Sequence, residues 1–288
     1  MSEQYNRSNQ THQTRNRDAG FTLIELLVVI SIIAILMGIL MPSLSAAKKM
    51  AQSIACSSNL RSLTIAWRMY ADGNDDKLVA AETGLKNRPT WFSGQLSYTS
   101  DPVNWDTEND MTKSPLWSYV GKDPKIFKCP ADMAKVTNSA GGTVKRVRSN
   151  SMSQVFGRGC WLDKTYNSQG QQVWRTYSKL STIRNPVKTW VFVDEHPDSI
   201  NDAAFANACT EASSEGTAQI IDFPANYHNG ACGFSFADGH AIVHKWTGSK
   251  IRNAPLFYGA NGDLQLNVPA ETSWEDVRWM AENTTVKK

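Results

Sequence analysis

The chain has 288 residues, a net charge of +3 and a charged fraction of 20%. This mild positive balance comes without a basic stripe interleaved with aromatics, so nucleic acid is excluded as an expected partner. Once the polar leader and the apolar run at the N-terminus are set aside, about 245 residues remain, enough for one large domain or a domain with long insertions.

The first 20 residues form a polar leader in which Arg7, Arg15 and Arg17 outnumber Glu3 and Asp18. A basic excess next to an apolar segment keeps that side of the chain in the cytoplasm. The leader is therefore expected to be cytoplasmic, with the bulk of the chain exported.

An apolar run from Phe21 to Met41 contains one charged residue, Glu25. As a helix it is about 30 Å long, enough to cross a bilayer, and it is apolar on all faces. A carboxylate in such a segment is costly and normally has a partner. A cut between Gly20 and Phe21 would create an ammonium one turn from Glu25. In a stack of identical helices, Glu25 of one subunit would then neutralise the Phe21 amine of the next.

Residues 18–42 resemble the class III signal of type IV pilins and type II secretion pseudopilins, through the sequence GFTLIELLV and a proline at Pro42. The resemblance implies cleavage after Gly20 by a prepilin peptidase and methylation of Phe21. It also implies that other pilin or pseudopilin subunits and membrane lipid are partners. The expected location is the bacterial inner membrane, single-pass, with the head in the periplasm or exterior, and a filament after assembly.

Two alternatives stand beside this interpretation. One is an uncleaved single-span anchor. The other is an ordinary secretory signal cut near Ser45-Ala46-Ala47. The apolar run is longer than the usual hydrophobic region of such a signal, and it contains a carboxylate, which argues against the second alternative.

The helical pattern continues beyond the span and becomes amphipathic between Ser43 and Asp72. Its apolar stripes are Leu44, Ala47, Ala51 and Ile54, followed by Cys56, Leu60, Leu63, Trp67 and Tyr70. The sequence predicts one long helix over 21–72, with 21–41 in the membrane and 43–72 packed on a head. The loop signal Asp72-Gly73-Asn74-Asp75-Asp76 ends it.

Residues 73–288 are expected to form the exported head. The fold class is α+β, a pilin-like lollipop with one long N-terminal helix packed on an antiparallel β-sheet and long loops. The predicted elements are a short helix over Ser114–Val120 beginning at Pro115, strands over 188–194, 233–237 and 241–246, a turn at Asp238-Gly239, and a helix over Ser273–Glu282 with Ser273 as N-cap and Asp276 at the third position.

Nine residues separate His228 from Asp238-Gly239. Within the hairpin segment 228–246, this spacing resembles the H-x9-DG signature of pilin-like proteins abundant in planctomycetes and related bacteria. Cys129-Pro130 and Asp194-Glu195 belong to the same resemblance. It supports the architecture more than any activity.

Two groups of residues are candidates for a metal site. His228 and Asp238 combine an imidazole with a carboxylate. Acidic residues follow the strand that ends at Asp194, and hard oxygen ligands on a loop suit calcium, which major pseudopilins bind. The candidate metal residues are Asp194, Glu195, Asp198, Asp238 and His228, and calcium is the only cofactor considered. The alternative for the first group is that Asp238-Gly239 only makes a turn and His228 bonds to it or to nearby backbone. The alternative for the second is that its acids cap turns in a solvated loop.

The chain has five cysteines, so at most two disulfides can form. On sequence position alone, Cys209–Cys232 is the preferred pair and Cys56–Cys129 the second. No Cys-x-x-Cys pair is present, so the sequence does not indicate a zinc knuckle.

The predicted function is that of a structural subunit and not an enzyme, since no motif for a catalytic nucleophile is present. A rival is a membrane-anchored extracellular module that binds a glycan or a protein and does not polymerise. A platform for a glycan would come from Trp91, Trp105, Trp117, Trp161 and Trp174, which are alternatively core residues. A third interpretation is an anchored hydrolase built on His228 and Asp238.

Overall fold

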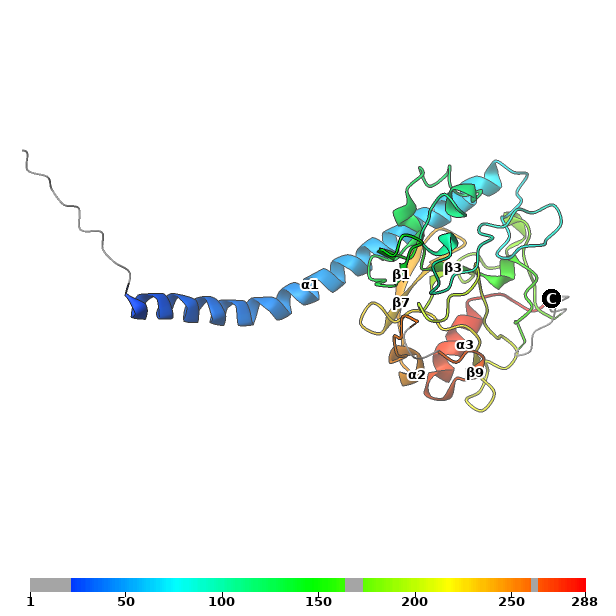
Figure 1. Cartoon of the computed structure of the whole chain (residues 1–288). Helices are drawn as coiled ribbons and strands as arrows, with labels where there is room; N and C mark the ends of the chain where they lie inside the picture. Colours follow the sequence, from blue (N-terminus) through cyan, green and yellow to red (C-terminus); the bar gives the residue numbers. More distant parts are fainter. Residues whose placement is uncertain (1–21, 164–172, 260–263) are drawn as a thin grey trace, which may run out of the picture. The chain divides into compact units, whose positions relative to one another are not determined.

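A computed structural model of the chain describes residues 22–163, 173–259 and 264–288. The chain divides into two compact units, Met1–Ala47 and Lys48–Lys288. One helix, α1 (Leu23–Asp72), continues from the first unit into the second (Figure 1). The second unit, called the head below, also contains the helices α2 (Ser249–Arg252) and α3 (Trp274–Glu282).

The head contains nine strands among the described residues, most of them short. They are β1 (Lys135–Thr137), β2 (Thr143–Lys145), β3 (Asn150–Ser153), β4 (Trp190–Asp194), β5 (Ala204–Phe205), β6 (Gln219–Ile220), β7 (Ala231–Phe236), β8 (Ala241–Lys245) and β9 (Val268–Pro269). Short 3-10 helices lie before, between and after the strands, at Pro102–Asn104, Met111–Lys113, Pro124–Phe127, Gln154–Phe156, Leu180–Thr182 and Glu271–Ser273.

The first half of α1 is apolar and exposed. Every side chain from Thr22 to Met50 is exposed, and the helix passes Pro42 without ending. By length and composition, it is the one helix among the described residues that is long and apolar enough to cross a membrane. Such a surface requires an apolar environment.

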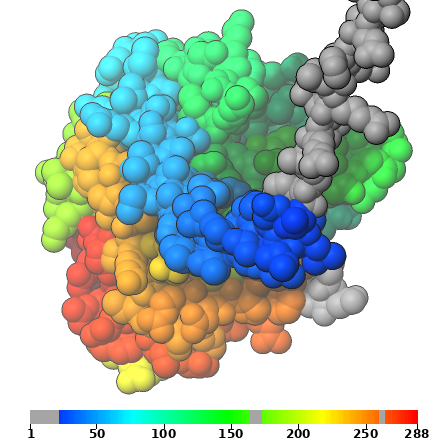
Figure 2. Space-filling model, turned by 90° about the vertical axis from the view of Figure 1, so that its left-hand side faces the viewer, coloured from blue at the N-terminus to red at the C-terminus, as the bar shows by residue number. Residues whose placement is uncertain are grey.

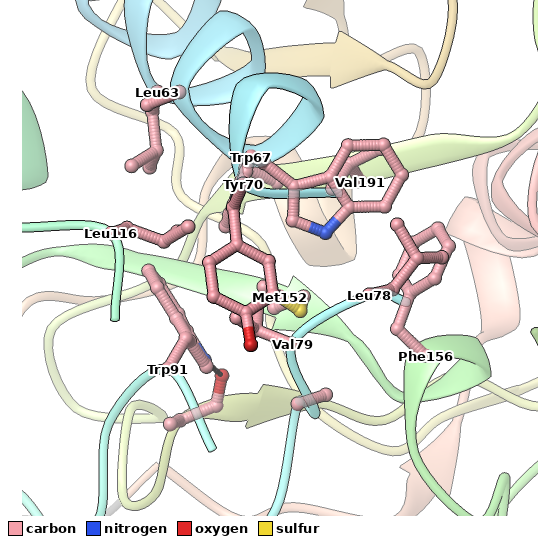
Figure 3. Close-up of a cluster of buried hydrophobic side chains, with 14 of the residues drawn as sticks. Leu63, Trp67, Tyr70, Leu78, Val79, Trp91, Leu116, Met152, Phe156 and Val191 are labelled. Carbon is pink, nitrogen blue, oxygen red and sulfur yellow. Dashed lines mark hydrogen bonds between the residues drawn. The ribbon is translucent and has the colours of Figure 1, made fainter. Parts of the chain in front are cut away.

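The second half of α1 packs on the head through the stripe that begins at Cys56. Leu63, Trp67 and Tyr70 point from α1 into a cluster of buried side chains that includes Trp91 (Figure 3). The stripe predicted from Cys56 to Tyr70 is therefore confirmed. The stripe predicted before it is wrong, because Leu44 and Ile54 are each 66% exposed. Periodicity alone does not reveal where along a helix the head begins.

The main sheet has five strands in the order β5-β3-β4-β7-β8. All neighbouring pairs are antiparallel except β3 and β5, which are parallel. The predicted strands over 188–194, 233–237 and 241–246 correspond to β4, β7 and β8. As predicted, Asp238-Gly239 joins β7 to β8, and Gly239 has a φ of +102°, which favours glycine.

The two faces of β7 have different partners, as the two-residue period of a strand requires. On one face, Ser235 accepts a hydrogen bond from Thr64 of α1 at 2.7 Å. On the other, Phe234 packs in a second core with Trp190 and with Met280 of α3. Arg68 of α1 also donates to the carbonyl of Ala237 at 2.5 Å. In the space-filling view, the pale blue part of α1 accordingly lies beside the yellow-orange segment of the sheet (Figure 2).

Two predicted details are wrong. Ser114–Val120 is not a helix but a run of turns, in which Trp117 donates to the carbonyl of Ser114 and Val120 to that of Leu116. Ser273 does precede α3, but its hydroxyl accepts from the backbone of Ile251 rather than capping the helix. At Ser273, a contact far away in the sequence therefore takes the place of the predicted cap.

Candidate functional site

The N-terminus of α1 is closed by a reciprocal pair of side chains. The Glu25 carboxylate accepts from both the backbone N–H and the hydroxyl of Thr22, each at 2.8 Å. The Glu25 N–H in turn donates to the Thr22 hydroxyl at 3.3 Å. This is a capping box. It gives hydrogen-bond acceptors to backbone N–H groups of the first turn, which have no carbonyl of a preceding turn to bond to. The sequence signal for this cap is the Thr-x-x-Glu spacing of Thr22 and Glu25, and it was not among the predictions. The predicted processing residues Gly20 and Phe21 lie outside the described residues.

The head holds a second candidate site, which we call the four-residue cluster: Cys56, Cys129, Asp194 and His228. All four residues are buried, and one potential ligand atom from each lies within 4.8 Å of the others. The Cys56 thiol donates to Asp194 Oδ2 at 2.6 Å. Cys129 Sγ lies 3.3 Å from His228 Nε2, which is 4.0 Å from Asp194 Oδ2.

Four separate segments of the chain supply these residues. Cys56 belongs to the buried stripe of α1, and Asp194 is the last residue of β4. Cys129 follows the 3-10 turn that ends at Phe127, and His228 lies in the turn before β7. Their convergence therefore depends on packing α1 against the end of the central strands.

Surrounding groups fix the orientation of the ligand atoms. Asn150 of β3 donates to Asp194 Oδ1 at 2.6 Å, which leaves Oδ2 facing Cys56. The Ser149 hydroxyl accepts from the backbone N–H of Cys129 at 2.8 Å. Gly233 of β7 lies against the cluster, since a Cβ there would come within 3.0 Å of Cys56 Sγ and 2.9 Å of Asp194 Oδ2. Supported side chains of this kind are typical of a pre-arranged site.

Burial determines the protonation of the cluster. It raises the pKa of Asp194 to about 7 and lowers the pKa of His228. A hydrogen bond with Cys129, together with burial, raises the pKa of the Cys56 thiol. Each of these shifts favours the uncharged form, as expected where charges are removed from water.

The structure does not bring together the five residues named as candidate metal ligands, neither the acidic group considered for calcium nor the pair His228 and Asp238. Asp194 and His228 meet in the cluster, but Asp238 pairs with His240 at 2.6 Å. Asp198 accepts from the backbone of Phe257 and Gly259, and Glu195 accepts from the Ser199 hydroxyl. No ion pair joins His228 to Asp238 in the described parts of the chain, so the hydrolase interpretation loses its proposed pair.

Neither predicted disulfide is formed in the structure, where all five cysteines are free thiols. Cys209 accepts from the Asn207 amide at 3.5 Å, whereas Cys232 donates to the carbonyl of Asp194 at 3.1 Å. Cys56 and Cys129 are neighbours, as that pairing required, but they are joined through the cluster and not by a bond. Positions in the sequence do not show that Cys56 and Cys129 lie beside the same residues, Asp194 and His228.

The five tryptophans proposed as a glycan platform lie in different environments. Trp91 is fully buried in the core around α1, and Trp117 packs against the same core. Trp174 packs on the second core, and Trp161 on a third, small cluster. Trp105 lines the cavity described next. The core interpretation therefore describes most of them better.

A cavity of about 660 Å³ lies beside the four-residue cluster, and Cys129 is part of its lining. Its charged lining residues are Lys125, Lys128, Lys145, Arg146, Asp123 and Asp132. Arg146 is buried, and none of its guanidinium nitrogens has a hydrogen-bond partner. The lining is thus basic overall, with a buried cation facing it.

Comparison with known proteins concerns mainly the N-terminal part of the chain. Residues 15–41 match the family model described as a prokaryotic N-terminal methylation motif. The chain is 40% identical over 74 residues to the "Type IV wide pilus major component PilA4" of Thermus thermophilus; these residues are 24% of this chain and 56% of the relative. The chain thus spans about half the length of this curated relative. No solved structure matches the chain.

Proposed function

Because the chain is type IV pilin-like, we propose that it is a structural subunit that is cut after Gly20 and assembled through α1 into a type IV pilus-type or type II secretion-type filament. A prepilin peptidase would perform the cut and methylate Phe21. Before assembly, the subunit would be held in the bacterial inner membrane by a single span, with the head in the periplasm or exterior. Its partners would be membrane lipid and other pilin or pseudopilin subunits.

The observation that supports this proposal most directly is the surface of α1 before the head. Its side chains are exposed and mostly apolar as far as Ala47, and the one charged residue of α1 before Lys48 is Glu25, in the first turn. A lipid anchor alone would not need a carboxylate there, because it makes insertion less favourable. In a filament, the carboxylate would have a cationic partner, the Phe21 amine of a neighbouring subunit.

The mass of the N-terminal peptide of the mature protein tests the proposal. We expect a chain that begins at N-methylated Phe21. Gly20→Leu, which removes the small residue before the cut, should leave a chain that begins at Met1. An unmodified protein that begins at Met1, or one that begins near Lys48, would contradict the proposal.

A second candidate is an anchored module that binds a partner and does not polymerise. The cavity beside Cys129 favours it, since its volume suits a small ligand and its basic lining with buried Arg146 suits an anionic one. Processing at Phe21 without filaments, together with anion binding that Arg146→Met abolishes, would favour this candidate over the first.

A further inference from the structure

The four-residue cluster has the composition of a metal site. We propose that Cys56, Cys129, Asp194 and His228 bind one zinc ion, which fastens α1 to the sheet of the head. The proposal does not depend on the filament function, because it concerns only the fold of the head.

The geometry fits a tetrahedral ion. Zinc binds thiolate sulfur, imidazole nitrogen and carboxylate oxygen at about 2.0–2.3 Å, which places neighbouring ligand atoms about 3.3–3.8 Å apart. The 3.3 Å between Cys129 and His228 lies in that range, whereas the 2.6 Å between Cys56 and Asp194 is shorter and the 4.0 Å between His228 and Asp194 is slightly longer. Small side-chain rotations would equalise them.

The ligand types select the metal. Two sulfurs and one imidazole are soft to intermediate donors, which favour zinc, whereas calcium takes six to eight oxygen ligands. The cluster offers one carboxylate, and its second oxygen is already bonded to Asn150. Four protein ligands also close the coordination sphere, which is typical of a structural site and not of a catalytic one.

The surroundings keep the space between the ligands open. At position 233, any side chain would enter the cluster, and the glycine leaves room for Cys56 and Asp194. The segment that carries Cys129 is fixed to α1, because Asn59 donates to the carbonyls of Lys125 and Lys128 at 3.0 and 3.2 Å. The cavity beside Cys129 offers a route by which an ion can enter.

A zinc ion here would join segments that are far apart in the sequence. Cys56 and Asp194 are 138 positions apart, and Cys129 and His228 are 99 apart. Because the ion would bind the folded head and not the unfolded chain, it would stabilise the attachment of α1.

The experiment measures metal content in the full-length chain, purified from membranes in detergent. We expect about one zinc per chain by inductively coupled plasma mass spectrometry, as four ligands require. The variants Cys56→Ser, Cys129→Ser, Asp194→Asn and His228→Gln should each lose most of the zinc. Cys209→Ser is the matched control, since it removes a buried thiol outside the cluster and should retain the metal.

Measurements on the wild-type protein test the proposal even if the variants do not fold. Removal of zinc by a chelator should lower the melting temperature, and added Zn²⁺ should restore it while added Ca²⁺ should not. Co²⁺ in place of zinc should show the charge-transfer absorption of a thiolate-bound ion.

Three results would overturn the proposal. They are a purified chain without bound zinc whose melting temperature does not respond to Zn²⁺, zinc that remains in the double variant Cys56→Ser/Cys129→Ser, and a Cys56–Cys129 disulfide in the native protein. The last is found by peptide mapping without reduction, and it would mean that the two sulfurs bind each other and not a metal.

Discussion

The carboxylate of Glu25 accepts two hydrogen bonds from Thr22, so the one acid of the apolar segment is bonded within its own helix. Capping and pairing with a neighbour's amine are different roles for the same group. A carboxylate has enough lone pairs for both, and variants can separate the two roles.

Glu25→Gln is expected to retain the cap, because its amide oxygen still accepts from Thr22, but to lose the charge. We therefore expect Glu25→Gln and Glu25→Val to insert in the membrane and to fail in filament incorporation, as judged by fractionation of sheared filaments. Thr22→Val loses the hydroxyl and keeps the charge, so it should still assemble. Normal assembly of Glu25→Gln would show that capping, and not charge, is what assembly needs.

Trp67 contributes the largest side chain of α1 to the head and is fully buried. Truncation of a buried tryptophan costs about 3–5 kcal/mol through lost contacts and the cavity left behind. Trp67→Ala should lower the free energy of unfolding of the head by that amount in a denaturant titration. Met69 is 48% exposed on the same helix, so Met69→Ala is the control and should change stability by about 0.5 kcal/mol or less. Equal effects of the two variants would contradict the packing described here.

Gly233 approaches α1 more closely than a side chain permits. A Cβ there would lie 2.5 Å from Leu60 Cδ1, in addition to its contacts with Cys56 and Asp194. Overpacking of a core typically costs about 1–3 kcal/mol, and Gly233→Ala should destabilise the head by that amount in a denaturant titration. Gly216 has nothing within 4 Å of a built Cβ, so Gly216→Ala is the matched control and should be nearly neutral. A neutral Gly233→Ala would mean that α1 lies farther from β7.

Asp222 predicts a pH dependence of stability. Burial raises its pKa from 3.8 to about 8 in the folded head, and its carboxylate accepts from the backbone N–H of Ala206 at 2.6 Å. A raised pKa means that the folded state binds the proton more tightly. The protonated Asp222 therefore stabilises the folded head fully at a pH below the pKa that it has in the unfolded chain. This stabilisation is lost as the pH rises through its pKa in the folded head.

We expect the free energy of unfolding to fall between about pH 4 and pH 8, and to fall less steeply in Asp222→Asn, which is neutral throughout and still accepts from Ala206. Asp75 is exposed, so Asp75→Asn is the control and should leave the slope of the free energy of unfolding against pH unchanged. The comparison uses denaturant titrations at several pH values. Identical slopes for the wild type and Asp222→Asn would contradict the shift.

Local patterns predicted much of this fold, because the elements concerned depend on neighbours in sequence. The long helix follows from its apolar run and its stripe, and the hairpin of β7 and β8 follows from Asp238-Gly239. Strand β3 was missed, since Asn150–Ser153 is polar apart from Met152 and is buried by packing alone.

The candidate site in the head could be predicted only in part. Asp194 and His228 were predicted as metal ligands, but the other predicted ligands, Glu195, Asp198 and Asp238, are not part of the cluster. The absence of a Cys-x-x-Cys pair argued against zinc, yet that criterion counts only cysteines close in sequence. Cys56 and Cys129 meet because α1 packs beside the turn after Phe127, which no local pattern encodes.

The attachments of α1 to the head also have a mechanical consequence. Three residues of α1 form hydrogen bonds to the sheet. Cys56 bonds to the last residue of β4, Thr64 to Ser235 of β7, and Arg68 to the residue that follows β7. These positions span about 18 Å of helix at 1.5 Å per residue. Tension along α1 therefore loads all three attachments in shear at once, and the head resists being drawn off its helix better than it would if they broke one after another.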